Sequence, residues 1–237
     1  MSKRKPDKTA QANALYRHGL NLLRRKEFAR ALADFSRVIE LEPAQFKAYF
    51  SRGRVYQVQR KYQASVEDFS RVLRLQPDHT SIYKVFYHRG RALAALDLYQ
   101  KAIADFSRVI RMQPRHVKAY YHRGLVFFWG CWDLAAAIQD FSSILEIDPH
   151  NLEALLIRGL AHTRRAEPAK AVHDYCQVIK LNPEFFKKYQ QDLQTAYLPD
   201  VAGLQDTRNA TSVTLSDVHV SMTFGDKPAM HTAVPTQ

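Results

Sequence analysis

The chain reads Ala31-Leu-Ala-Asp34-Phe35-Ser-Arg37-Val-Ile-Glu-Leu-Glu-Pro43, and the same pattern returns four more times. The later copies occupy residues 65–77, 102–114, 137–149 and 171–183. A second pattern precedes each copy, a glycine that follows a basic residue. These glycines are Gly19, Gly53, Gly90, Gly124 and Gly159. The chain is therefore built from five units of about 34 residues, since a fixed period of this length is the signature of a repeat architecture.

Each unit is predicted to contain two helices. The small and apolar residues of the first unit, from Ala31 to Ile39, recur at helical spacing. The closing proline ends the second helix because it cannot continue the backbone hydrogen bonding. A glycine inside the first helix costs about 1 kcal/mol relative to alanine, so its recurrence requires a packing reason. We expect close approach of the second helix, with the small residue (Ala31 in the first unit) opposite the glycine.

These residues resemble the tetratricopeptide repeat over about residues 12–183. The resemblance implies an all-α, right-handed solenoid of five helix-turn-helix repeats. Two departures concern length: three extra residues lie between Pro77 and Gly90, and one extra residue lies near Gly130. The predicted repeats span about 12–45, 46–79, 83–116, 117–151 and 152–185.

The ends of the chain differ from the repeats. Residues 1–11 form a basic N-terminal tail, and residues 184–198 are expected to be a helix that caps the array, because a last repeat has no neighbour to cover its apolar face. Residues 199–237 are rich in Thr, Ser, Asp, Gly and Pro and indicate a mobile C-terminal tail. Two alternatives for this tail are a short recognition segment and occupation of the chain's own groove.

Composition and charge limit the classes of function. No uninterrupted apolar run is long enough to cross a membrane, and two cysteines cannot form a disulfide framework. We expect an intracellular, cytoplasmic protein, with a nuclear location as the alternative. The net charge is +12, and because residues 199–237 carry −2, residues 1–198 carry +14. Such a surface attracts anionic partners.

No enzyme motif is found in the sequence. Phosphate-binding glycine loops, paired-histidine metal motifs and nucleophile elbows are missing, so we expect neither catalysis, nor a metal site, nor a cofactor. His88 and His122 hold equivalent positions and are interpreted as packing or surface histidines.

One acid and one base recur in fixed register in every unit. The acid precedes the aromatic residue of the second helix, and the base precedes the glycine of the first. We expect them to form ion pairs within or between repeats. The acids are Asp34, Asp68, Asp105, Asp140 and Asp174, and the bases are His18, Arg52, Arg89, Arg123 and Arg158.

The resemblance implies that the first helices line a concave groove. Its wall would combine aromatic residues with Lys and Arg, which supply contact area and attract acidic ligands. The alternative is that these aromatics pack between repeats. The candidate partner-binding residues are Tyr16, Leu20, Lys47, Phe50, Arg54, Lys84, Tyr87, Arg91, Lys118, Tyr121, Leu125, Phe128 and Trp129.

The predicted function is that of a non-catalytic scaffold or adaptor, which binds an extended or helical, acidic segment of a partner protein. The carboxylate clamp of chaperone-binding family members is not matched, since only Lys84 fits at the aligned positions. Two alternatives remain: binding of RNA or another single-stranded nucleic acid through the basic array, and a regulatory role in a larger enzyme assembly.

Overall fold

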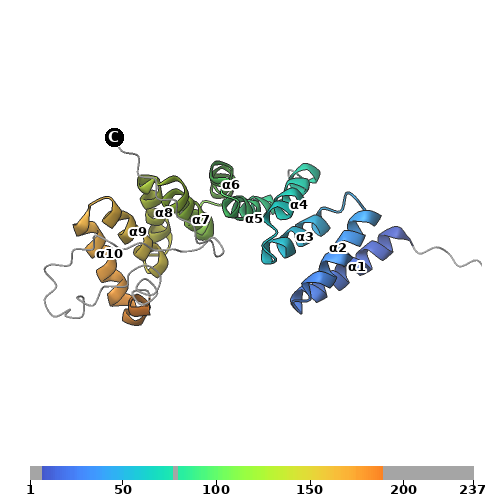
Figure 1. Cartoon of the computed structure of the whole chain (residues 1–237), viewed down its shortest axis with the longest axis horizontal. Helices are drawn as coiled ribbons and strands as arrows, with labels where there is room; N and C mark the ends of the chain where they lie inside the picture. The colour runs from blue at the N-terminus through green and yellow to red at the C-terminus, as the bar shows by residue number, and fades with distance from the viewer. Residues whose placement is uncertain (1–6, 77–79, 189–237) are drawn as a thin grey trace, which may run out of the picture. The chain divides into compact units, whose positions relative to one another are not determined.

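The computed structural model describes residues 7–76 and 80–188. The chain divides into two compact units, Met1–Cys131 and Trp132–Gln237, each of which is considered by itself (Figure 1). The helices of the first unit are α1 (Lys8–Arg24), α2 (Phe28–Leu41), α3 (Phe46–Val58), α4 (Tyr62–Leu75), α5 (Ile82–Ala95), α6 (Tyr99–Met112), α7 (Val117–Leu125) and the π-helix η1 (Val126–Cys131). Those of the second are α8 (Leu134–Ile147), α9 (Leu152–Arg164) and α10 (Pro168–Leu181).

Helix-turn-helix pairs build both units. In the first unit α1 packs on α2, α3 on α4 and α5 on α6, and each pair contacts the next. In the second unit α9 packs on both α8 and α10. The predicted all-α class and the helix-turn-helix solenoid are confirmed, and the described residues contain no strand. The fourth predicted repeat contributes α7 and η1 to one unit and α8 to the other.

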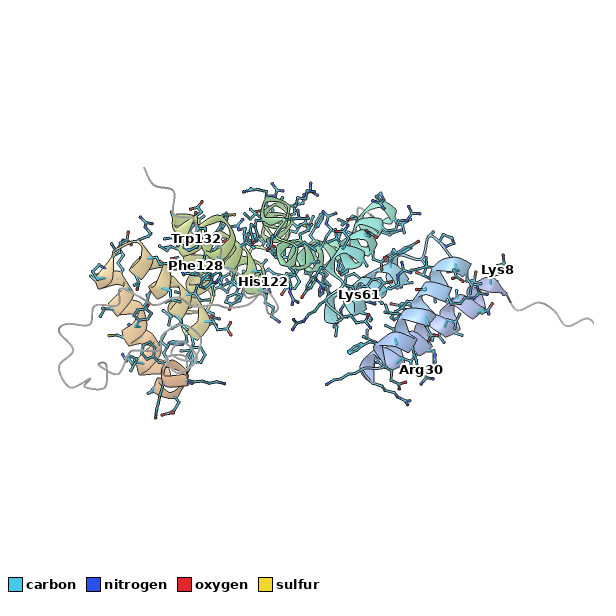
Figure 2. All side chains as sticks on the ribbon, viewed as in Figure 1. Lys8, Arg30, Lys61, His122, Phe128 and Trp132 are labelled. Atoms are coloured by element: carbon cyan, nitrogen blue, oxygen red, sulfur yellow. The ribbon has the colours of Figure 1, made fainter. Side chains whose placement is uncertain are left out.

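The array begins earlier than the sequence indicated. Helix α1 starts at Lys8 (labelled in Figure 2), within the predicted tail 1–11, because the Asp7 carboxylate accepts a hydrogen bond from the Thr9 N–H and caps the helix. At the other end residues 183–188 are helical, and the Phe186 ring lies 6.0 Å from that of Tyr175. The remainder of the expected capping helix and the predicted tail 199–237 lie outside the described residues.

The repeated glycine makes room for an aromatic ring. A Cβ atom added to Gly19, Gly53 or Gly90 would lie 2.8–3.0 Å from a ring carbon of Phe35, Phe69 or Phe106 respectively. Gly159 meets the Tyr175 ring in the same way, at 2.7 Å. Close approach is thus confirmed. The small residue of the second repeat also lies at the glycine, since the Ser65 hydroxyl donates to the Gly53 carbonyl at 2.9 Å. The ring that an added Cβ would meet belongs to the aromatic residue four positions after the small residue.

We expect Gly90→Ala to destabilise the chain by about 1–3 kcal/mol, although alanine is the better helix former. The new methyl group would compress the fully buried Phe106 ring. Chemical denaturation of Gly90→Ala, Phe106→Leu and the double variant would measure the coupling. The smaller leucine should recover part of the loss in the double variant, and strict additivity would contradict the contact.

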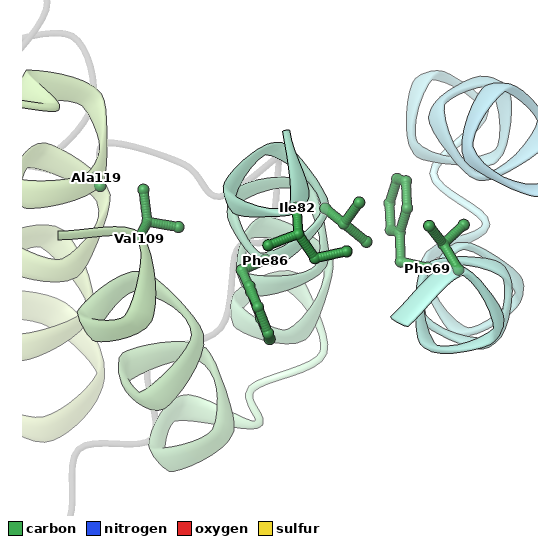
Figure 3. Close-up of a cluster of buried hydrophobic side chains, with 7 residues drawn as sticks. Phe69, Ile82, Phe86, Val109 and Ala119 are labelled. Atoms are coloured by element: carbon green, nitrogen blue, oxygen red, sulfur yellow. The ribbon is translucent and has the colours of Figure 1, made fainter. Parts of the chain in front are cut away.

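The core of the first unit is continuous across repeats. Figure 3 shows one cluster in which Phe69 on α4, Phe86 on α5 and Val109 on α6 contribute side chains to the same apolar interior. Partly buried aromatics such as Phe50 and Tyr87 pack against this cluster. Because neighbouring repeats share the cluster, each pair of helices depends on the next for burial of its apolar face.

The length departures have local structural effects. The extra residue of the fourth repeat lies in η1, where the helix widens to a π-helix and the Gly130 backbone lies against the Tyr99 ring. A π-helical turn is the usual way for a helix to absorb one inserted residue. The other departure, three extra residues, lies between Pro77 and Gly90. Helix α5 in this stretch starts eight residues before its glycine, whereas α3 starts seven residues before Gly53.

The recurring acid and base form ion pairs in the first, second, third and fifth repeats, as expected. In the third repeat the Arg89 guanidinium donates from Nε and Nη2 to the two oxygens of Asp105, at 2.7 and 2.8 Å. Its Nη1 also donates to the Ser70 hydroxyl of the preceding repeat at 3.1 Å. The same arrangement joins Arg52 to Asp68 and Ser36, and Arg158 to Asp174 and Ser142.

Each arginine therefore connects two helices of its own repeat to the repeat before it. The Asp105 side chain is only 4% exposed and that of Arg89 is 21% exposed, so these pairs are more buried than ordinary surface pairs. Burial raises the pKa of Asp68, while the hydrogen bonds from Arg52 act against that rise. Removing one partner would leave a buried charge without compensation.

We predict that Arg89→Ala costs about 3 kcal/mol of unfolding free energy, because Asp105 would keep a buried and unpaired charge. Ser70→Ala, which removes only the link to the preceding repeat, should cost about 1 kcal/mol. Replacing both charged partners, as Arg89→Met with Asp105→Leu, should be milder than Arg89→Ala alone. Urea denaturation of the set is the measurement, and equal losses for all three variants would contradict the prediction.

Candidate binding pocket on the first helices

An apolar pocket of about 220 Å³ opens on the first helices of the first unit. Its wall combines residues from four helices of three successive repeats. Two lysines, Lys47 on α3 and Lys84 on α5, belong to this lining, and both are exposed. The other lining residues are Tyr16, Phe46, Phe50, Val72, Ser81, Ile82 and Val85.

Repeat register explains why these residues meet. Tyr16 and Phe50 both lie three residues before their repeat's glycine, and Lys47 and Lys84 both lie six residues before it. Equivalent positions on neighbouring first helices face the same side, so a pocket between them collects the same residue types from each repeat. The expectation for four residues, Tyr16, Lys47, Phe50 and Lys84, therefore agrees with their position around one cavity.

Five lining residues were missed by the sequence reasoning. The sequence could have drawn attention to Val85, since the other four repeats have alanine at this position. Ser81 and Ile82 stand at the start of α5, beside the three-residue insertion. Val72 is a buried core residue of α4, which the pattern assigned only to packing. Phe46 is the first residue of α3 and carried no signal.

The aromatic residues predicted for the groove wall are partly buried. They therefore combine the two interpretations, exposure on a binding surface and packing between helices. The rings of Tyr16, Phe50 and Tyr87 lie 5.7–6.3 Å from the aromatic ring of the second helix in their own repeat. The Tyr16 hydroxyl is also 3.3 Å from that of Ser51 in the next repeat. One part of each ring thus fixes the packing of the helices, and the rest remains at the surface.

Two predicted groove residues belong to the core instead. Leu125 is 7% exposed and Phe128 is fully buried, and neither of them lines the pocket. Phe128 lies within η1, where the ring of Trp129 meets it edge-on at 4.7 Å. The π-helix begins at Val126 and changes the direction of the side chains within it, Phe128 included, which the spacing alone could not show.

The other predicted residues remain accessible but lie outside the pocket. Arg54, Arg91 and Lys118 are exposed. The Arg91 guanidinium lies 5.9 Å from the Tyr87 ring centre, within the range of a cation–π contact. The remaining predicted residues, all partly buried, are Leu20, Tyr87, Tyr121 and Trp129.

The two register-equivalent histidines are packing residues. The His88 ring stacks on Phe69 at 5.8 Å, and the His122 ring stacks on Phe106 at 5.9 Å. Burial, reinforced by nearby arginines, lowers the pKa of His88 to about 4 and that of His122 to about 3. The buried His122 Nδ1 has no hydrogen-bond partner within the described part of the chain. Both rings therefore remain neutral at physiological pH.

We expect the folded state to lose stability as the pH falls below about 6.5, because unfolding lets both rings take up protons that the fold excludes. Between about pH 7.5 and pH 5 the loss should be about 1–2 kcal/mol for each histidine. Urea denaturation at both pH values should show a smaller loss for the double variant His88→Asn/His122→Asn. The exposed His150→Asn is the control, and equal pH dependence in all chains would contradict the prediction.

Comparison with known proteins agrees with the helix-pair geometry. A family model of the tetratricopeptide repeat matches residues 16–80 and 87–129. These two stretches are thus similar to the tetratricopeptide repeat. No curated protein sequence matches the chain. Repeats of this class stack on their neighbours into extended arrays with concave binding surfaces.

Solved tetratricopeptide structures share this fold at low sequence identity. YrrB, described as a TPR protein with an unusual peptide-binding site, is 22% identical over 76% of this chain and 91% of its own, with a TM-score of 0.65. MamA from Desulfovibrio magneticus RS-1 is also 22% identical, over 73% of this chain and 96% of its own, with a TM-score of 0.69. A tetratricopeptide repeat protein from Parabacteroides merdae is 19% identical over 78% of this chain and 73% of its own, with a TM-score of 0.69.

The described residues contain no candidate for a membrane span or for a metal site. No helix in this part of the chain has the length and apolar character required to span a membrane. Over the same residues, no three or more His, Cys, Asp or Glu side chains cluster in a way that could hold a metal ion.

Proposed function

We propose that this chain is a non-catalytic scaffold whose pocket holds an apolar side chain of a partner protein, with acidic residues of the same segment facing Lys47 and Lys84. The observation that carries the proposal is the combination of an apolar cavity and two exposed lysines in a single lining. YrrB, which shares the fold, has a peptide-binding site, and this supports a peptide as the type of ligand.

Burial of the anchor would supply most of the affinity. The cavity of about 220 Å³ has the size for one large apolar side chain, and full burial of such a side chain contributes about 1.5–3 kcal/mol. Interfaces commonly concentrate their binding energy in a few side chains that fill pockets of this kind. The Phe46 and Phe50 rings offer the anchor rigid apolar surface on one helix.

The lysines would select the partner. Exposed charges at the edge of an interface mainly raise the association rate and exclude partners of the same charge. Lys47 and Lys84 come from neighbouring repeats, so together they favour a segment with a carboxylate on each side of its anchor. Lys118, Arg91 and Arg54 extend the same positive charge beyond the pocket.

We expect selection of short random peptides on the full chain to enrich sequences with a large apolar residue flanked by Asp or Glu. Affinity of an enriched peptide should fall at least about tenfold in Lys47→Glu/Lys84→Glu, because attraction becomes repulsion. Fluorescence anisotropy with the labelled peptide is the measurement. The thermal melt followed by circular dichroism should change little, since both side chains are exposed.

The matched control is Lys61→Glu, at another exposed lysine, which precedes α4 as its N-cap residue and does not line the pocket. It should leave peptide affinity within about twofold of the original chain. Enriched peptides without acidic residues, or equal losses in the control, would show that the pocket is not the binding site.

A further inference from the structure

The outer faces of α4 and α6 carry four exposed arginines, one pair on each helix. Arg71 and Arg74 lie one turn apart near the end of α4, and Arg108 and Arg111 hold the equivalent positions on α6. We refer to these four residues as the outer arginine set. In the same two helices Phe69, Val72, Phe106 and Val109 are buried, so the arginines lie on the side away from the core. Figure 2 shows nitrogen-tipped side chains projecting beyond the ribbons of both helices.

In the other repeats the corresponding residues do not form a pair of uncompensated arginines. On α2 the equivalent residues are Arg37 and Glu40, which form an ion pair at 2.6 Å. On α8 they are Ser143 and Glu146, and on α10 Gln177 and Lys180. Within the described residues no carboxylate forms an ion pair with any member of the outer arginine set.

Like charges one turn apart on a helix destabilise it by a few tenths of a kcal/mol. Favourable interaction with the helix dipole accounts for Arg74 and Arg111, which lie in the last turns of α4 and α6. The helix dipole does not explain why arginines also stand one turn earlier, at Arg71 and Arg108. The two acids one turn before Arg71 have other partners: Asp68 pairs with Arg52 at 2.8 Å, and Glu67 accepts a hydrogen bond from Gln63 at 3.2 Å.

Contacts with α5 fix the position of one member. The Arg108 guanidinium lies 5.1 Å from the ring centre of Phe86, a buried residue of α5. Phe86 shares its apolar cluster with Phe69 and Val72 of α4, and in Figure 3 the helix that carries Phe86 lies between Phe69 of α4 and Val109 of α6. A guanidinium held over a ring loses less conformational freedom when it binds a ligand.

We propose that the outer arginine set binds the phosphodiester backbone of a nucleic acid, on a face separate from the peptide pocket. Guanidinium groups match phosphate oxygens in a planar, two-bond geometry and remain charged at any physiological pH. Side chains three residues apart on a helix are about 5–6 Å apart at Cβ. Each arginine pair can therefore contact neighbouring phosphates of one strand, and the second pair lies on the second helix of the next repeat.

This surface fits a phosphate backbone better than it fits a lipid bilayer. Helices that bind membrane surfaces insert an apolar face beside their basic residues. Of the large apolar side chains on α4 and α6, both fully described, only Met112 is exposed. The arginine face also lacks exposed aromatic rings on these helices, so binding through it should depend on phosphates and be largely independent of base sequence.

The test measures binding of a labelled uridine oligonucleotide and of a thymidine oligonucleotide to the full chain by fluorescence anisotropy over a range of salt concentrations. We expect Arg71→Gln/Arg74→Gln/Arg108→Gln/Arg111→Gln to bind at least about 30-fold more weakly at low salt. Its plot of log affinity against log salt should be shallower by about 3, because each lost phosphate contact on a single strand removes about 0.7 from the slope. Replacing all four by lysine should keep the slope and lose affinity only modestly.

Two controls locate the site. Arg37→Gln removes an arginine at the same register whose charge is already paired, and it should leave the slope unchanged. Lys47→Glu/Lys84→Glu should reduce peptide binding without changing the slope for the oligonucleotides, which separates this inference from the proposed peptide function.

Three outcomes would overturn the inference. They are no measurable oligonucleotide binding at low salt, an unchanged slope in the glutamine variant, and binding to phosphatidylserine vesicles in the absence of oligonucleotide binding. If the fourfold variant does not fold, the two double variants, one on each helix, should each reduce the slope by about half as much.

Discussion

The contact between a glycine of each first helix and the aromatic ring of its second helix is the constraint on which the rest of the structure depends. The ring of Phe35, Phe69 or Phe106 lies so close to the glycine backbone that no Cβ fits between them. This distance brings the two helices of a repeat together and fixes the rotation of each about its own axis. Once that rotation is fixed, the side of the first helix that faces away from its partner is also fixed.

The arginine bridges extend this constraint from one repeat to the next. Arg52 and Arg89 each bind the aspartate of their own repeat and a serine of the repeat before. Because the aspartates are nearly fully buried, such a bridge tolerates little change in the geometry of stacking. Helices held in this way present equivalent positions at regular intervals, which is how Lys47 and Lys84 come to line one pocket.

The repeats differ in a few side chains, and the proposed functions depend on these differences. The second and third repeats have an uncompensated pair of arginines on the outer face, where the first has an arginine paired with a glutamate. Val85 replaces an alanine found in the other four repeats, and it lines the pocket. A shared framework thus supports two surfaces of different chemistry, an apolar pocket with lysines on one side and arginines alone on the other.

The sequence alone determined the helix pairs, their order and the ion pairs between Arg and Asp, because all of these depend on residues at fixed spacing within one repeat. It also placed four of the pocket residues, since register is preserved from repeat to repeat. Only the tertiary structure showed that Val72 and Ile82 complete the pocket, because they meet there from different helices, one of them next to an insertion. It also showed that Leu125 and Phe128 are buried, and that Phe128 lies in a π-helix, where the single extra residue widens the helix in a way that no spacing rule specifies.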